Sequence, residues 1–240
     1  MWDVVSDERG VAHVQMSRDA SLGAHGLPVA RFFRWDPPAV SLGWRQPPPA
    51  WMHSIAWPAA GCQRVERPSG GGVALHGSDV CVAVVVPQAW AVGLRAAMEA
   101  VCRSAAALCR SFGVEPQVLL DEPRQARITY CSMERSPYAV LVNGRKVAGF
   151  AARRYPRSWL VQGSLLVRPV PEVLQRLLPP VLQEALASRA IALSAAARVP
   201  VDEGGVLHRW ASHWASWWPA GLPSGRVEPP GTLVAFGEGE

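Results

Sequence analysis

Lysine is almost missing from this sequence. It occurs once, at Lys146, although the 240 residues include 24 Lys and Arg residues together. Arginine therefore carries nearly all of the positive charge, and arginine keeps its proton in proteins, whereas the pKa of a lysine responds to burial. A coding bias toward GC-rich codons explains the general scarcity of lysine. The survival of Lys146 is then either chance or a chemical requirement, and both readings stay open on this fact alone.

Cysteine is too scarce and too irregularly spaced for a disulfide framework or a zinc site. The chain has five cysteines, an odd number, with no CxxC spacing and no companion HxxxH pair. We therefore expect no metal. Residues 1 to 10 lack the basic and apolar regions of a signal peptide, and no apolar run is long enough to cross a bilayer. The expected location is a reducing cytoplasm, without membrane contact.

Long runs of like charge are also missing. The net charge of +5 suits an acidic partner, but the absence of a basic block makes nucleic acid an unexpected one. The nearest approach to a cluster is Arg153, Arg154 and Arg157, with Tyr155 and Trp159 between them. This group is either the solvated face of a strand or a docking site for an acidic protein or a phosphate.

Hydrophobic periodicity predicts a mixture of helices and strands. The clearest helix covers residues 87 to 113, with a proline before its first turn and a glycine at its end. β-branched residues predict a buried strand ending at Pro87. Further strands are expected at residues 116–120, 127–130 and 158–167, and further helices at residues 171–190 and 204–218.

The strongest local signal is a hairpin around Asn143 and Gly144. An Asn-Gly pair between two strand-like runs favours a two-residue type I′ turn. In that register Leu141 faces Lys146. The alternation of a strand also places Phe150 on the same face as Lys146.

Three consecutive glycines follow an Arg-rich strand in RVERPSGGGVALHG, residues 64 to 77. Such a run allows positive φ and close backbone approach, so its N–H groups can bind an anion or a carbonyl oxygen. Alone, the run is as consistent with a flexible turn, and His76 with a structural histidine.

Four segments, in order, resemble motifs of the lipoate-protein ligase A and biotin ligase superfamily, most closely those of its cysteine-dependent octanoyltransferases. RFFRWDPPAVSLGWRQ is similar to the pattern RFYGWxPxxxSxGxxQ, and VERPSGGGVALHG to the RRPTGG loop with its following histidine. CSMERSPYAVLVNGRKVAGFAARR is similar to CFxxxSxYExVVxGRKVAGSAQxR, and VQGSLLV to LQHGSxLL. HVQMSRDASL is more weakly similar to the NMALDEAL helix.

The resemblance implies an α+β fold in which a mixed or antiparallel β-sheet packs with helices. The implied domains are a lipoate/biotin ligase-like catalytic domain over residues 1–180, a short helical C-terminal extension over 181–218 and an extended tail over 219–240.

The resemblance also implies an acyltransferase. Cys131 would take an octanoyl or lipoyl group from the phosphopantetheine of acyl carrier protein and pass it to a lysine of a lipoyl domain, with no cofactor. Lys146 would lie against the acyl carbonyl, as oxyanion donors do. The other residues implied in acyl or substrate binding are Arg67, Ser69, Gly70, Gly71, Gly72, His76, Gly149, Phe150 and Gly163. Arg153, Arg154 and Arg157 are the weaker docking candidates.

Four departures from the family patterns keep other functions open. Glu66, Phe150, Ala152 and Gln162 stand where the family has Arg, Ser, Gln and His. The triple glycine resembles ATP-dependent lipoate-protein ligases, which would use ATP and Mg and an acyl-adenylate, with Cys131 incidental. Against a ligase, the Asn-Asp pair that ligases carry upstream of the lysine is absent. A non-catalytic protein that binds acyl groups or lipoyl domains is a third hypothesis.

Overall fold

A seven-stranded sheet forms the centre of the computed structural model, which describes residues 2–120 and 129–219. Its strand order is β1-β2-β6-β10-β9-β8-β7, and only β1 and β2 pair in parallel. The strands are β1 (Asp3–Gly10), β2 (Val29–Trp35), β6 (Asp79–Pro87), β7 (Gln117–Leu119), β8 (Ala139–Val142), β9 (Arg145–Arg154) and β10 (Ser158–Leu166). A second sheet has the order β4 (Gln63–Glu66), β3 (Ala39–Leu42), β5 (Ala74–His76).

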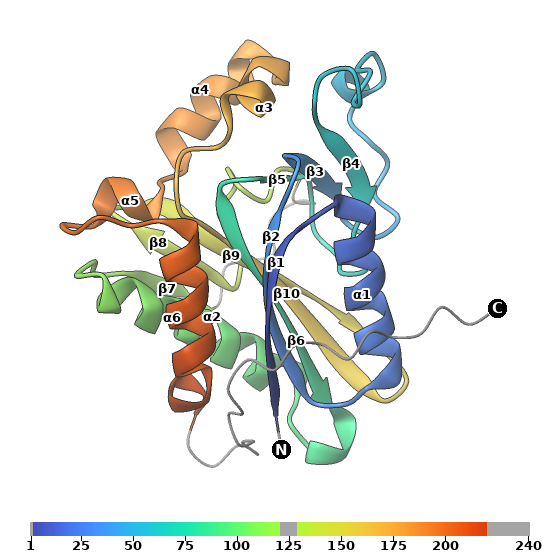
Figure 1. Cartoon of the computed structure of the whole chain (residues 1–240), viewed down its shortest axis with the longest axis vertical. Coiled ribbons are helices and arrows are strands. Elements are labelled where there is room, and N and C mark those ends of the chain that lie inside the picture. Colours follow the sequence, from blue (N-terminus) through green and yellow to red (C-terminus); the bar gives the residue numbers. More distant parts are fainter. Residues whose placement is uncertain (1, 121–128, 220–240) are drawn as a thin grey trace.

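Helices cover both faces of the large sheet (Figure 1). They are α1 (Ala12–His25), α2 (Leu94–Ser111), α3 (Glu172–Leu177), α4 (Pro180–Arg189), α5 (Leu193–Ala196) and α6 (Glu203–Trp217), with 3-10 turns η1 (Ala50–Met52) and η2 (Gln88–Trp90). In Figure 1, α2 and α6 lie on one side of the sheet and α1 lies on the other. Across residues 2–120 and 129–219, none of the helices is long and apolar enough to span a membrane.

The central strand β6 explains the two-sided core. All nine of its residues are buried, as expected of a strand covered on both faces. Its even-numbered valines, Val80 to Val86, belong to the cluster formed with α2 and α6. Its odd-numbered residues, Cys81, Ala83 and Val85, belong to a separate cluster with α1. The predicted α+β architecture is therefore present, with the site-bearing loops on the α1 side.

The predicted hairpin is confirmed. Asn143 and Gly144 have φ of 51° and 72°, as a type I′ turn requires, and Leu141 pairs with Lys146. A β-bulge follows, because the register between β8 and β9 shifts by one residue between Val140 and Leu141. The alternation of β9 therefore changes phase just after Lys146.

Two predicted helices have different boundaries in the structure. The helix expected over residues 87–113 begins only at Leu94, because β6 runs to Pro87 and Ala91 takes the left-handed conformation with φ of 56°. The helix expected over 171–190 is two helices, since Pro179 lacks the N–H that a continuous helix needs. Of the strand expected at 127–130, Arg127 and Ile128 lie outside the described residues.

The C-terminal helix α6 belongs to the main core. Trp210 and Trp214 are fully buried and pack against Phe32 of β2. Trp210 also donates a hydrogen bond to Ser104 Oγ of α2 at 3.1 Å. The domain limits at residues 180 and 218 stay a prediction, and the expected tail from residue 220 onward lies outside the described residues.

If α6 holds the sheet and α2 together, Trp210→Ala should lower the free energy of unfolding by about 3–5 kcal/mol, because it empties a buried indole site. Urea denaturation checks this. Trp44→Ala removes an indole that is 42% exposed and should cost less than about 1 kcal/mol. Equal losses for the two variants would contradict the central place given to α6.

Candidate active site

Cys131 is attached to the glycine loop by backbone hydrogen bonds. Cys131 N donates to Val73 O at 2.8 Å, and Val73 N donates to Thr129 O at 2.7 Å. These two bonds form a parallel bridge between Val73 and Tyr130. The bridge places the cysteine segment alongside the end of the triple glycine, although the two are far apart in the sequence.

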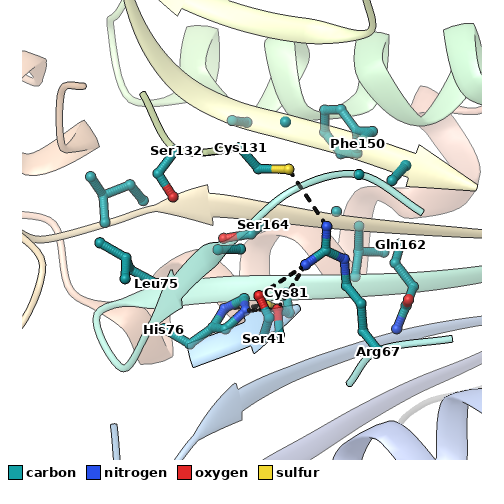
Figure 2. Close-up of a pocket in the computed structure, with 18 of the residues that line it drawn as sticks. Ser41, Arg67, Leu75, His76, Cys81, Cys131, Ser132, Phe150, Gln162 and Ser164 are labelled. Carbon is teal, nitrogen blue, oxygen red and sulfur yellow. Dashed lines mark hydrogen bonds between the residues drawn. The ribbon is translucent and has the colours of Figure 1, made fainter. Parts of the chain in front are cut away.

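Two donors converge on the Cys131 sulfur. Gly72 N lies 3.0 Å from Sγ and Arg67 Nη2 lies 3.5 Å from it. Figure 2 shows the guanidinium directed at the sulfur from below. Arg67 Nη2 also donates to Gly70 O at 2.8 Å, so the loop itself orients the cation. An N–H donor and a guanidinium thus lie within hydrogen-bonding distance of the one sulfur.

Gly71 leaves the space that this arrangement needs. Its φ is 91°, a conformation that L side chains rarely adopt. A Cβ at Gly71 would lie 2.9 Å from Arg67 Nη2 and 3.1 Å from Cys131 Sγ. Any other residue would thus separate the guanidinium from the thiol.

Lys146 is buried, and its ammonium is held by neutral oxygens. Nζ donates to Ser136 Oγ at 2.8 Å and to Glu134 O at 3.1 Å. Its side chain passes over Gly149, where a Cβ would lie 2.7 Å from Lys146 Cε. Burial lowers the pKa of Lys146 below its ordinary 10.5, against the opposing charges of Cys131 and Glu134.

A cavity of about 310 Å³ connects these groups. Arg67, Gly71, Cys131, Lys146 and Gly149 line it together with His76 and Gly163. Much of the remaining wall is apolar, including Met16, Phe33, Leu75, Leu166 and Val170. Such a wall suits an acyl chain, and the volume is at the low end of the roughly 300–1,000 Å³ of small-ligand clefts.

The expectation that Phe150 shares a strand face with Lys146 is wrong. The bulge in β9 puts Lys146 and Gly149 on one face, and Phe150 packs on the other, in the cluster with α2. Its ring occupies the space above Gly163, where a Cβ would lie 2.1 Å from Phe150 Cδ1. Phe150 still borders the cavity, but from the core side of the sheet.

The other loop residues frame the cavity without lining it. Gly70 and Gly72 act through the backbone contacts given above, and Ser69 is fully buried. Ser69 N donates to Gln162 Oε1 at 3.1 Å, and Gln162 Nε2 donates to Asp19 Oδ2 at 2.5 Å. Gln162, at the position of the family histidine, thereby connects the loop to α1.

The substitution at Glu66 lies outside the cavity. Glu66 is exposed on β4, and its carboxylate accepts a hydrogen bond from Arg45 N at 3.2 Å. The Arg-to-Glu departure at this position therefore lies outside the wall of the cavity that Cys131 lines. Ala152 is also absent from the cavity wall.

The three arginines named as docking candidates do not form one cluster. Arg153 packs over the rings of Trp44 and Tyr155 and donates to Pro68 O at 3.2 Å. Arg154 lies over Trp159, and Arg157 is exposed beside Gly26, in the turn that joins β9 to β10. Of the three, Arg153 alone touches the loop that carries the site residues.

Three polar residues of the site were missing from the expected set. Ser136 accepts from Lys146, and Ser41 accepts from Arg67 Nη1 at 3.0 Å. Asp79 lies 2.7 Å from the ring of His76. Ser41 and Ser136 occupy the serine positions of the family patterns, so the sequence could have identified both. No pattern quoted for the family includes Asp79.

The chain belongs to the family of the lipoyl protein ligase A/B catalytic domain, whose model matches residues 14–200. It is 29% identical over 191 residues to "Octanoyltransferase LipM" of Kyrpidia tusciae, covering 72% of this chain and 68% of that protein. It is 33% identical over 156 residues to "Octanoyltransferase LipM" of Symbiobacterium thermophilum, covering 60% of this chain and 57% of that protein. The matches thus span a little over half to two thirds of these curated relatives, and the resemblance to octanoyltransferases is confirmed.

Solved structures confirm the fold. A lipoate-protein ligase A bound with ATP superposes with a TM-score of 0.66 at 18% identity, over 88% of this chain and 83% of that one. A bipartite lipoate protein ligase from Thermoplasma acidophilum, described with its E2 lipoyl domain, gives 0.62 at 17% identity, over 88% and 82%. At these identities the likeness concerns the fold alone.

All five cysteines are free, and Cys131 is the one that is not buried. Burial raises the pKa of Cys62, and it raises the pKa of Cys102 and of Cys109 to about 12. Burial, together with the charge of Asp79, raises the pKa of Cys81 well above its ordinary value. These four thiols carry little thiolate at neutral pH.

Iodoacetamide at neutral pH should therefore alkylate Cys131 at least about tenfold faster than any other cysteine, because the thiolate is the reacting form. Peptide mapping by mass spectrometry after short exposures measures the five rates separately. Cys131→Ser is the control and should abolish the fast phase. If the buried Cys62 were labelled as fast as Cys131, the surroundings of Cys131 would give it no special reactivity, and this prediction would be wrong.

Proposed function

We propose that this protein is a cysteine-dependent acyltransferase of protein lipoylation, which moves an octanoyl group from acyl carrier protein to a lysine of a lipoyl domain. The observation that carries the proposal is the placement of Cys131 Sγ between Gly72 N and Arg67 Nη2 at the wall of an apolar cavity that Lys146 also lines. The curated relatives named octanoyltransferases support the same chemistry.

In the first half-reaction, the Cys131 thiolate attacks the thioester carbonyl of the acyl carrier. The bond from sulfur to the acyl carbon forms, the carrier's carbon–sulfur bond breaks, and the phosphopantetheine thiolate leaves and takes up a proton. In the second, a neutral lysine amine of the lipoyl domain attacks the Cys131 thioester, loses a proton and releases the Cys131 thiolate. Negative charge develops on the acyl oxygen in both steps, and the buried ammonium of Lys146 is the cation that stabilises it.

The acidic carrier would approach over the rim formed by Trp44 and Arg153. Trp44 is 42% exposed, and the Arg45 and Arg153 guanidinium groups both lie on its ring. Because the glycine loop passes directly beneath, with Pro68 O bonded to Arg153, a phosphate bound here would direct a thioester toward Cys131. We place the protein in the cytoplasm, where its free thiols stay reduced, and assign it no cofactor.

An ATP-dependent ligase is the alternative that the test must exclude. Its acyl-adenylate would use the same cavity but would have no need of a thiolate at Cys131. A non-catalytic binding protein would need neither Cys131 nor Lys146, and both line the cavity.

The deciding experiment incubates the protein with octanoyl acyl carrier protein without ATP. Intact mass should increase by one octanoyl group, which hydroxylamine removes and a lipoyl domain discharges. Peptide mapping should place the group on Cys131. Cys131→Ser should lower transfer at least about a thousandfold, because a serine hydroxyl without an adjacent base is a poor nucleophile, and Cys62→Ser should leave transfer intact. Octanoylation of a lipoyl domain by Cys131→Ser at full rate, with octanoate and ATP, would instead establish the ligase.

The pH dependence tests the role of Lys146. Since the ammonium is the form that stabilises the oxyanion and burial lowers its pKa, transfer should decline with rising pH at a midpoint below 10.5. Loss of the Lys146 proton does not by itself destabilise the fold. At pH values between the lowered pKa of folded Lys146 and 10.5, the lysine is more protonated in the unfolded chain than in the folded one. The contribution of Lys146 to the free energy of unfolding therefore increases with pH in this range.

Transfer rates and circular dichroism measured on the same samples separate activity from folding. A transfer rate that stays constant above the ordinary lysine pKa while the protein remains folded would show that Lys146 has no part in the reaction.

Lys146→Arg should be folded and inactive, because the planar guanidinium does not fit an ammonium site.

A further inference from the structure

Behind Arg67 a chain of hydrogen bonds extends away from Cys131. Arg67 Nη1 donates to Ser41 Oγ at 3.0 Å, and Ser41 Oγ lies 2.8 Å from His76 Nε2. His76 Nδ1 lies 2.7 Å from Asp79 Oδ2. All four side chains are buried, with exposed fractions of at most 7%. Figure 2 shows Arg67 with the sulfur on one side and Ser41 and His76 on the other.

The donors and acceptors of this chain agree in one direction. Ser41 Oγ accepts from Arg67 Nη1, so the Ser41 hydroxyl keeps its own proton for a hydrogen bond to His76 Nε2. In the tautomer that carries its proton on Nδ1, His76 then donates to Asp79 Oδ2. Each member of the chain is thereby satisfied, as buried polar groups must be.

The far end of the chain is fixed by rigid elements. Gly77 N donates to Asp79 Oδ1 at 2.9 Å, and Ser164 Oγ of β10 donates to Asp79 Oδ2 at 2.6 Å. The indole of Trp35 stacks on the His76 ring, with centroids 4.2 Å apart and planes 18° apart. The histidine is thus held directly by Trp35 of β2 and, through Asp79, by Ser164 of β10.

We propose that Ser41, His76 and Asp79 are positioning residues that hold the Arg67 guanidinium against the Cys131 sulfur. Arginine has a long, flexible side chain, and its worth to a thiolate depends on its direction. Ser41 O, 3.2 Å from Nη1, and Gly70 O already fix part of the fork. The hydroxyl of Ser41 accepts a further hydrogen bond from Nη1. The orientation of this hydroxyl is set by His76, which Asp79 holds in turn.

The proposal rests on Cys131 being the nucleophile of the proposed function, and its test needs no acyl donor. The alkylation rate of Cys131 is measured at pH 7.5 for the full chain and for Ser41→Ala, Arg67→Gln and the double variant. Arg67→Gln should slow alkylation about tenfold, the scale of a lost hydrogen bond to a charged group, and Ser41→Ala about twofold to tenfold. In the Arg67→Gln background, Ser41→Ala should change the rate less than about twofold, because Ser41 acts through the arginine.

Matched variants separate positioning from stability. Ser104→Ala also removes a buried, hydrogen-bonded hydroxyl, on α2, and should lower the melting temperature without slowing alkylation. Ser41→Thr keeps the hydroxyl and should restore the rate. His76→Phe keeps a ring stacked on Trp35 without nitrogens, and should slow alkylation only where Arg67 is present.

Equal slowing by Ser41→Ala with and without Arg67 would overturn the proposal, as would a parental rate for Ser41→Ala alone. His76, Asp79 and Cys81 also offer ligand atoms within 4.8 Å of one another, so each assay is repeated with a chelator. A rate that falls on chelation would replace the hydrogen-bonded chain by a metal site. If the double-mutant cycle behaves as expected while octanoyl transfer fails, the positioning role stands and the proposed function is what fails.

Discussion

The site depends on the short parallel bridge between Val73 and residues 129–131. Two backbone hydrogen bonds, Val73 N to Thr129 O and Cys131 N to Val73 O, join the cysteine segment to the glycine loop. Backbone atoms make the bridge, so its geometry is independent of side-chain rotamers and transmits the rigidity of β5 to Cys131. The bridge brings Cys131 beside Gly72 N, and the other contacts of the Arg67 guanidinium then direct it at Sγ.

The β-bulge after Lys146 separates chemistry from packing. A regular β9 would place Lys146 and Phe150 on one face; the extra residue sends the lysine to the cavity and the phenylalanine to the core. The C-terminal segment secures this irregularity, because Ile191 N donates to Lys146 O at 2.9 Å and Ala190 bridges to Lys146. Residues beyond 180 therefore support the site directly, whatever their status as a separate extension.

The sequence predicted what local rules and motif spacing determine. The Asn-Gly hairpin, the buried strand β6 and the helix α6 each follow from turn chemistry or periodicity. The bulge did not follow, because nothing in RKVAGFAARR indicates an extra residue and only the partners of β8 and Ala190 reveal it. Asp79 was not predicted for a related reason. It is a carboxylate at the start of an apolar strand, and its hydrogen bonds to His76, Ser164 and Gly77 form only when the two sheets come together. The late start of α2 reflects the continuation of β6 to Pro87 and the left-handed backbone at Ala91, and neither is visible in the hydrophobic periodicity.

The two cations at Cys131 are solvated by neutral oxygens. Within the described residues, Arg67 bonds Gly70 O, Ser41 O and Ser41 Oγ, and Lys146 bonds Glu134 O and Ser136 Oγ. The Glu134 carboxylate accepts from Thr129 N and Tyr130 N instead. Burying a cation without a carboxylate partner costs stability, as the lowered pKa of Lys146 records. A carboxylate partner would offset this loss of stability, but it would also cancel the positive potential at the sulfur and at the acyl oxygen. Dipolar partners keep each cation in place while leaving its charge available to the anion that the proposed transfer would form, so in that proposal the composition of this site favours reaction over stability.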